Sequence, residues 1–378
     1  MKRARFAGMN STALISKLSV LGLCIVAATS ASFAQQGIEG RKLLKLEGPK
    51  ASVTYDLAGG SMADFHRIKE GVNPFTWNRP EKGDTAPRPM DHFICFDRWG
   101  QPSENEGKNG MPFHGEATSV EWSVLSGPSR EGNAVSATIL CALPMGGLTL
   151  TRTAKLSDTA PVLTVREVIK NVNKLGRVYN IVQHPSIAPS FLDESVIVDS
   201  NAWKGFMRES PWPTPEEPVV YWPFVAYKGT LVDLRRLGAE PNPAVTSFVF
   251  KDDVQQGWVT ACNPGKGLMV GYVWDVREYP WLNIWRNTKD GKPAARALEF
   301  GTTGLHRPFQ DILEKHAIFG KTLCEYIDAD VSVEKSYVVF LAEIPVNYKG
   351  VEELSRSDGK IVIRERDGGA AGDIALTY

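Results

Sequence analysis

Short runs of alternating apolar and polar residues, rich in β-branched side chains, recur along most of this chain and are separated by Gly, Pro, Asn and Asp. Such runs favour strands, because successive strand side chains point to opposite faces of a sheet. Helical periodicity is confined to residues 309–315 and 350–355. The sequence therefore predicts an antiparallel all-β protein. The expected strands lie at residues 51–55, 118–125, 134–143, 148–156, 161–172, 178–183, 195–199, 246–250, 257–262, 267–275 and 335–343.

The first 34 residues have the pattern of a secretory signal peptide. Lys2, Arg3 and Arg5 precede an apolar run at residues 18–28, and Ser-Phe-Ala at 32–34 provides a small-residue cleavage site. That run is too short to span a bilayer as a helix, and no later stretch is long enough. We therefore expect an exported protein, periplasmic or secreted after cleavage near Ala34, with no membrane span.

The charge balance argues against a nucleic-acid partner. The 378-residue chain has a formal net charge of zero, and removal of residues 1–34 takes away Lys and Arg but no acidic residue. The mature protein is therefore mildly acidic, whereas nucleic-acid-binding surfaces are basic. Its length fits either two small domains or one large β domain.

Four cysteines remain after the predicted signal peptide: Cys95, Cys141, Cys262 and Cys324. None belongs to a Cys-x-x-Cys unit, so no zinc cluster is predicted. A large exported domain does not need disulfides for stability, which favours buried free thiols. The three possible pairings of these cysteines nevertheless stay open.

Two long Gly- and Pro-rich loops interrupt the strand pattern, at residues 77–110 and 209–223. Both contain tryptophan, and long loops on a β scaffold commonly form binding surfaces. The C-terminal segment 358–378 contains one more possible strand at 360–364, after which we expect the chain to be weakly ordered.

Aromatic residues suggest a carbohydrate partner, because an aromatic ring packs against the apolar face of a pyranose. The chain has ten tryptophans and ten tyrosines, and Trp274, Trp281 and Trp285 fall in one segment with Asp275. The alternative is that each of these aromatics belongs to the hydrophobic core. Interleaved charges favour a binding site that includes Trp274, Asp275 and Trp285.

Three further residues are candidates for chemistry. His114 lies in Met-Pro-Phe-His-Gly-Glu, and His184 precedes Pro185, which we expect to end regular strand pairing there. Glu299 lies between Leu298 and Phe300, whose side chains would point away from the carboxylate on a strand. A carboxylate between apolar residues is either exposed at a sheet edge or held in a pocket, where desolvation raises its pKa and suits it to proton transfer.

Taken in order, His114, His184 and Glu299 make the chain resemble the galactose mutarotase-like family, which includes the aldose 1-epimerases. Pro112-Phe113-His114-Gly115 with Trp122 is similar to that family's first histidine region, and Gln183-His184-Pro185 falls where it carries a second histidine. Residues 229–235 resemble its Gly-Thr-x-x-Asp-x-Arg segment, and Leu298-Glu299 falls where it carries a catalytic glutamate. The match extends over residues 91–309.

The resemblance implies a β-supersandwich formed by one large domain, residues 35–357, followed by a C-terminal strand or tail at 358–378. It also implies sugar mutarotation without metal or cofactor. Glu299 would take a proton from the anomeric hydroxyl and His184 would protonate the ring oxygen, while His114 and Arg98 would orient the sugar.

Two other functions stay open at this point. One is a noncatalytic carbohydrate-binding protein, and the other is a polysaccharide lyase or glycoside hydrolase on a related fold. The sequence does not specify the sugar or the oligomeric state.

Overall fold

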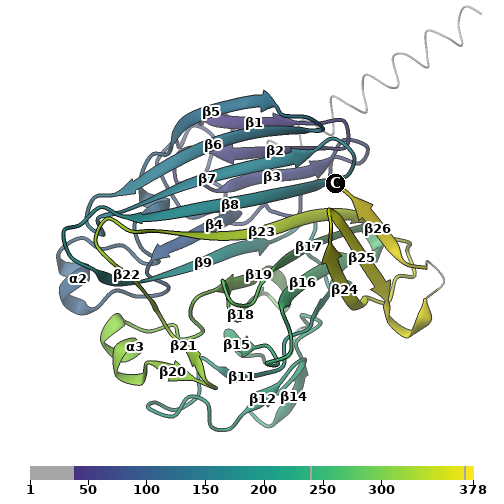
Figure 1. Cartoon of the computed structure of the whole chain (residues 1–378). Helices are drawn as coiled ribbons and strands as arrows, with labels where there is room; N and C mark the ends of the chain where they lie inside the picture. Colours follow the sequence, from purple (N-terminus) through teal and green to yellow (C-terminus); the bar gives the residue numbers. More distant parts are fainter. Residues whose placement is uncertain (1–37, 239–240, 370–371) are drawn as a thin grey trace, which may run out of the picture.

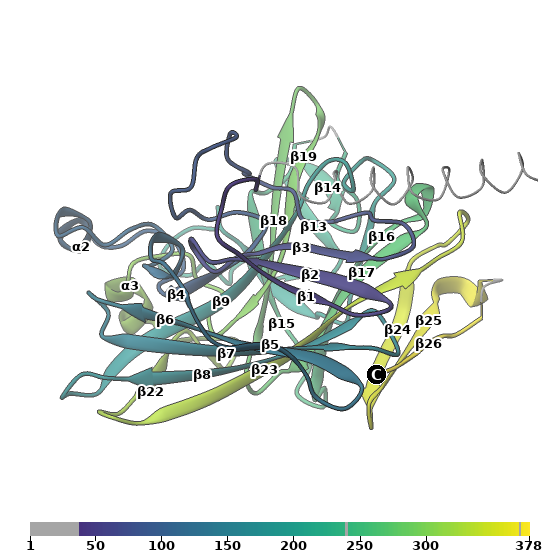
Figure 2. The same cartoon turned by 90° about the horizontal axis from the view of Figure 1, so that it is seen from above.

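The computed structural model describes residues 38–238, 241–369 and 372–378. The predicted signal peptide lies outside these residues. Two large sheets face each other, and two small sheets lie beside them (Figures 1 and 2). Every strand pair in the described part of the chain is antiparallel, which confirms the predicted fold class.

The larger sheet has 13 strands and carries the residues of the candidate site. Its order is β1 (Leu43–Glu47), β2 (Ala51–Asp56), β3 (Met62–Arg67), β4 (His92–Asp97), β9 (Arg177–Ile187), β19 (Lys292–Gly301), β18 (Trp281–Lys289), β15 (Val245–Val249), β11 (Lys204–Met207), β12 (Val220–Tyr221), β13 (Phe224–Tyr227) and β14 (Thr230–Asp233), with β22 (Glu325–Ile327) paired to β9.

The second sheet has eight strands and forms the other layer. Its order is β10 (Ile197–Ser200), β16 (Gln256–Asn263), β17 (Leu268–Asp275), β23 (Ser332–Glu343), β8 (Val162–Asn171), β7 (Leu148–Ser157), β6 (Ala134–Leu143) and β5 (Ser123–Arg130). Strands β5–β8 and β23 lie across β1–β3 in Figure 1.

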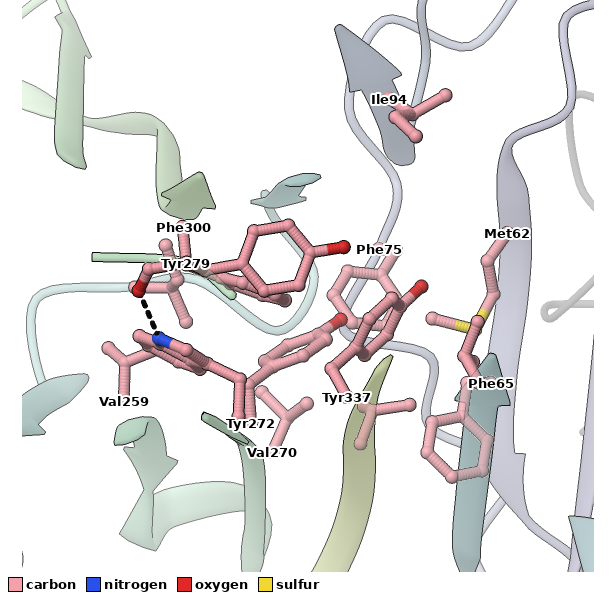
Figure 3. Close-up of a cluster of buried hydrophobic side chains, with 14 of the residues drawn as sticks. Met62, Phe65, Phe75, Ile94, Val259, Val270, Tyr272, Tyr279, Phe300 and Tyr337 are labelled. Atoms are coloured by element: carbon pink, nitrogen blue, oxygen red, sulfur yellow. Dashed lines mark hydrogen bonds between the residues drawn. The ribbon is translucent and has the colours of Figure 1, made fainter. Parts of the chain in front are cut away.

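The main core lies between the two sheets. Burial along β7 and β8 alternates, as expected for strands with one face toward a core and the other toward solvent. Figure 3 shows core side chains from both layers, including Phe65 and Phe300 of the larger sheet and Tyr272 and Tyr337 of the smaller one. The larger sheet therefore buries one face against this core and leaves its other face available for a site.

The C-terminal segment differs from its prediction. Residues 351–357 form strand β24 (Val351–Ser357) instead of a helix, because they pair with β25 (Lys360–Glu365). The chain end, expected to be weakly ordered, forms β26 (Ile374–Thr377), which pairs with β25 in a three-stranded sheet. Its apolar residues Ile374 and Leu376 pack against a buried cluster that joins this sheet to the main body.

Helices are short. The predicted helix at 309–315 is present as α3 (Phe309–Lys315). The segment 77–110, expected to be a loop, contains strand β4 as well as α2 (Glu104–Lys108), which a Ser103 capping box begins. The remaining short elements are the strand pair β20 (Ala317–Ile318) and β21 (Lys321–Thr322) and the 3-10 turns η1 (Ala117–Ser119), η2 (Pro264–Lys266) and η3 (Arg366–Gly368). Because η1 occupies residues 117–119, the strand expected at 118–125 begins only at Ser123.

All four cysteines of the described chain are free thiols; Cys95, Cys141 and Cys262 are buried and Cys324 is partly buried. No helix among the described residues has the length and apolar character needed to cross a bilayer.

Candidate active site

The strand register brings His184 and Glu299 together. In β9 and β19, Ser186 pairs with Ala297 and Gln183 pairs with Phe300, which leaves His184 directly opposite Glu299. No ladder pair is formed between those two points. Pro185 has no N–H to donate, so the interruption falls where the sequence places a proline. However, β9 continues to Ile187, so His184 lies within a strand and not at its end, as the sequence had suggested.

The alternation of β19 separates Glu299 from its neighbours. Leu298 and Phe300 point into the core between the two sheets, as the sequence predicted, and both are fully buried there. The Glu299 carboxyl therefore lies on the opposite face of the 13-stranded sheet. On that face it is 1 % exposed, so it is covered by the walls of a cavity and not by the main core.

That cavity has a volume of about 210 Å³ and mostly aromatic walls. Its lining residues are Trp77, Pro89, Phe93, Trp99, Phe113, His114, His184, Arg208, Val245, Trp285, Glu299 and His306. It combines apolar walls with a small number of convergent polar groups, which is typical of a small-molecule site. We call it the main cavity.

One hydrogen bond and one close contact hold the Glu299 carboxyl. The Trp99 indole Nε1 donates to Oε2 at 2.7 Å, and Oε1 lies 3.3 Å from Nε2 of His184. Burial raises the pKa of Glu299 well above its ordinary value, and the Trp99 hydrogen bond opposes this only partly. Burial therefore favours the protonated form of this carboxyl.

His184 is held in place by its strand neighbours. Its ring stacks on that of Phe93, the residue opposite it on β4, with the ring centroids 4.1 Å apart. Its Nδ1 lies 2.9 Å from the Ser186 hydroxyl oxygen, which leaves Nε2 to face Glu299. Burial lowers the pKa of His184 to about 3. Because both pKa shifts favour the uncharged forms, the two side chains form a close contact between a neutral imidazole and a protonated carboxyl.

A tight turn positions His114. Its own N–H donates to the Gly100 carbonyl at 2.9 Å, and the Gly100 N–H donates to Nδ1 of its ring at 3.0 Å. A Cβ on Gly115 would lie 2.1 Å from the Phe96 carbonyl oxygen, so only glycine fits beside this histidine. Since Nδ1 accepts a hydrogen bond, the neutral ring carries its proton on Nε2 and can donate it to a ligand. Burial also holds the pKa of His114 well below its ordinary value.

A third imidazole, His306, was not singled out from the sequence. It lies on the loop after β19, its ring 5.7 Å from that of His114 and 4.8 Å from that of Trp99. Burial and, to a smaller extent, the nearby Arg208 guanidinium lower its pKa to about 4. Two features of the sequence could have indicated His306 as a site residue. The chain has only six histidines, and His306 follows the Gly-Thr-Thr-Gly segment at residues 301–304.

The structure does not bring three of the predicted binding residues to the main cavity. Trp274 is 1 % exposed within the core, where it stacks on Phe300 with the centroids 4.3 Å apart. It belongs to the eight-stranded sheet, on the opposite side of β19 from Glu299. The core alternative considered for the aromatic segment is therefore correct for Trp274.

Asp275 and Arg98 have other partners. Asp275 pairs with the exposed Arg277 at the end of β17, away from the main cavity. Arg98 pairs with Asp97 and Glu106 and lines a separate cavity of about 530 Å³. Of the residues predicted to bind sugar, His114 and Trp285 line the main cavity with the pair His184–Glu299.

No metal site accompanies these groups. Within the described ranges, no set of three or more His, Cys, Asp or Glu side chains is arranged to hold a metal ion. The aromatic walls and the His184–Glu299 contact can bind a small polar molecule and move protons at two of its oxygens.

Comparison by sequence finds no matching family model and no match among curated proteins. Solved structures do match. A galactose mutarotase-like protein from Clostridium acetobutylicum is 14% identical, with a TM-score of 0.60 over 80% of this chain and 96% of that one. A galactose mutarotase-like protein from Lactobacillus casei is 16% identical, with a TM-score of 0.55 over 80% of this chain and 100% of that one.

A protein from Escherichia coli K12, provisionally named an aldose 1-epimerase, is 14% identical, with a TM-score of 0.57 over 81% of this chain and 100% of that one. At such identities the comparison concerns the arrangement of strands, and it agrees with the two facing antiparallel sheets described above. The chain has the fold of the galactose mutarotase-like proteins.

Proposed function

We propose that this protein is a mutarotase that interconverts the anomers of a free sugar by acid–base ring opening and closure. The observation that carries the proposal is the 3.3 Å contact between His184 Nε2 and Glu299 Oε1 at an aromatic-lined cavity. Anomer exchange needs one group to donate a proton and one to accept a proton at the anomeric centre. It needs no cofactor.

The two groups need not lie on opposite sides of the sugar. The anomeric hydroxyl and the ring oxygen are bonded to the same carbon, so an acid and a base in contact with each other can reach one oxygen each. Ring opening moves a proton from the hydroxyl to the base and another from the acid to the ring oxygen. After rotation about the C1–C2 bond, the reverse transfers close the ring as the other anomer.

The pair starts with its single proton on the Glu299 carboxyl, because burial disfavours both the carboxylate and the imidazolium. In that state Glu299 protonates the ring oxygen and His184 takes the hydroxyl proton. The resemblance to the aldose 1-epimerases implied the opposite assignment. Transfer of the proton across the pair interconverts the two states, so the same two residues serve either direction of exchange.

The other lining groups would bind and orient the sugar. His114 presents an Nε2–H donor, and Trp77 and Trp285 provide flat apolar surfaces on the same face of the sheet. Among the residues that line the main cavity, Glu299 is the only carboxylate. A glycoside hydrolase mechanism that uses a pair of carboxylates would therefore lack its second carboxylate in this cavity.

The proposal is tested by NMR exchange between the anomers of free aldoses, with wild type, Glu299→Gln and His184→Asn. We expect catalysed exchange for wild type and a loss of about 10²–10⁴-fold in kcat for each variant. Glu278→Gln is the matched control, because that carboxyl is half-buried outside the cavity and accepts from Ser336. Sugar binding without catalysed exchange in wild type would instead identify a noncatalytic carbohydrate-binding protein.

We also propose that the protein acts outside the cytoplasm. The support is the basic and then apolar pattern of residues 2–34. Mass spectrometry of the protein recovered from the periplasm or medium should find a new N-terminus after Ala34, whereas an intact leader would contradict export by cleavage.

A further inference from the structure

A second cavity adjoins the main one. Its volume is about 370 Å³, and it shares Arg208, Val245 and His306 with the walls of the main cavity. Its other lining residues are Gln101, Phe206, Ser210, Trp212, Pro215, Ser247, Gly304, Leu305, Arg307, Pro308 and Asp311. The loop 209–223, which the sequence suggested as a binding surface, therefore forms part of this second cavity.

The second cavity offers groups suited to an uncharged polyhydroxy ligand. Ser210 presents a buried hydroxyl without a hydrogen-bond partner among the described residues, and Gln101 lines the opening with an amide. The charges of Arg307 and Asp311 neutralise each other at 2.7 Å. Arg307 also lies over the ring of Trp212, which forms an aromatic part of the wall.

Arg208 lies where the two cavities meet. It is exposed, and no ion pair or side-chain hydrogen bond holds its guanidinium among the described residues. Its five N–H donors are therefore available to oxygens of a ligand that passes from one cavity into the other. The main cavity alone, at about 210 Å³, is smaller than the ~300–1,000 Å³ of most ligand sites, whereas the two together fall within that range.

We propose that the two cavities bind the reducing end of a neutral disaccharide or longer oligosaccharide, with the terminal ring in the main cavity and the next ring in the second. The inference rests on the proposed mutarotation, because ring opening requires the terminal anomeric hydroxyl to be free. The second ring must then be attached through another hydroxyl of the first. Sugars joined through both anomeric carbons are excluded as substrates.

The test compares kcat/KM for anomer exchange of glucose with that of glucose disaccharides in α1,4, β1,4, β1,3 and α1,6 linkage. We expect at least one disaccharide to exceed glucose by about tenfold, because contacts to the remote ring also help to position the reacting one. Gln101→Trp fills the second cavity and Trp212→Ala removes part of its wall. Both should lower the ratio of disaccharide to glucose kcat/KM.

Trp203→Ala is the matched control, because Trp203 belongs to the same region of the chain but lies against Lys204 and Tyr221, outside both cavities. It should leave the ratio unchanged, and melting temperatures identify any variant that fails to fold. Equal kcat/KM for glucose and every disaccharide, or variants that change both by the same factor, would overturn the inference while leaving mutarotation intact.

If no sugar is anomerised, the proposed mutarotation fails and calorimetric binding tests the second cavity separately. Disaccharide affinity should then exceed glucose affinity in wild type and decrease in Gln101→Trp. Equal affinities in the two proteins would contradict the second ring site.

Discussion

Replacement of Trp99 by Phe tests how the Glu299 carboxyl is controlled. The Trp99 indole donates to Oε2 at 2.7 Å and lowers the pKa of Glu299, against the larger effect of burial. A hydrogen bond stabilises a charged acceptor by about 1.5–3 kcal/mol and a neutral one by about 0.5–1.5 kcal/mol. The carboxylate therefore loses about 1–1.5 kcal/mol more than the carboxylic acid when the donor is removed.

That difference corresponds to a rise of about one unit in the pKa of Glu299, since one unit equals about 1.4 kcal/mol. The His184–Glu299 pair needs one proton for the acid step, so loss of this proton at high pH causes the alkaline decline of kcat/KM. We expect Trp99→Phe to move the alkaline decline upward by about one pH unit. The acid limit, set by His184, should stay in place.

The assay is anomer exchange by NMR as a function of pH. Trp285→Phe is the matched control, because Trp285 lines the same cavity without a hydrogen bond to Glu299 among the described residues. It should change the rate without moving the alkaline decline. An alkaline decline that stays in place or moves downward in Trp99→Phe would refute this account of Glu299.

Three further predictions concern stability. The pKa of His184 is lowered to about 3 in the folded protein. As the pH falls, the unfolded chain therefore protonates this histidine before the folded protein does, which lowers the free energy of unfolding. Between about pH 6.5 and 3, urea unfolding should show wild type losing up to about 1.4 kcal/mol per pH unit more than His184→Asn; parallel losses would exclude His184 as the source. Trp274→Ala should cost about 3–5 kcal/mol, because it empties a core site. Sugar affinity measured by calorimetry in the folded variant should be retained, and its loss would return Trp274 to the binding site. Gly115→Ala meets the Phe96 carbonyl at a φ of +80°, so thermal unfolding should show a loss of at least about 1–3 kcal/mol. An unchanged midpoint would mean that this turn can relax.

The fold class and the orientation of the candidate residue Glu299 could be predicted from the sequence, because both depend on the alternation of side chains along strands. Alternating burial leaves a period-two pattern in the sequence, so the strands of both sheets were recognisable. Glu299 could be assigned to the face opposite Leu298 and Phe300 from the same alternation. The contact between Glu299 and His184 could not be predicted in this way, because it depends on the pairing of strands that are far apart in the sequence.

The errors have the same origin. Trp274 and Trp285 both lie in strands, but local periodicity does not say which sheet face meets the core. Pro185 has no backbone N–H to donate, yet β9 continues past it because Pro185 still pairs with His92 of β4. His306 lies on an irregular loop, where no periodic signal indicates that its ring reaches the cavity.

Cooperation between His184 and Glu299 is the central claim. The most direct measurement is the kcat for anomer exchange in His184→Asn, Glu299→Gln and the double variant, compared with wild type. If the two residues share one proton and act as a unit, the double variant loses about as much as either single variant. Losses that multiply in the double variant would mean that the two side chains act independently, which would contradict the account.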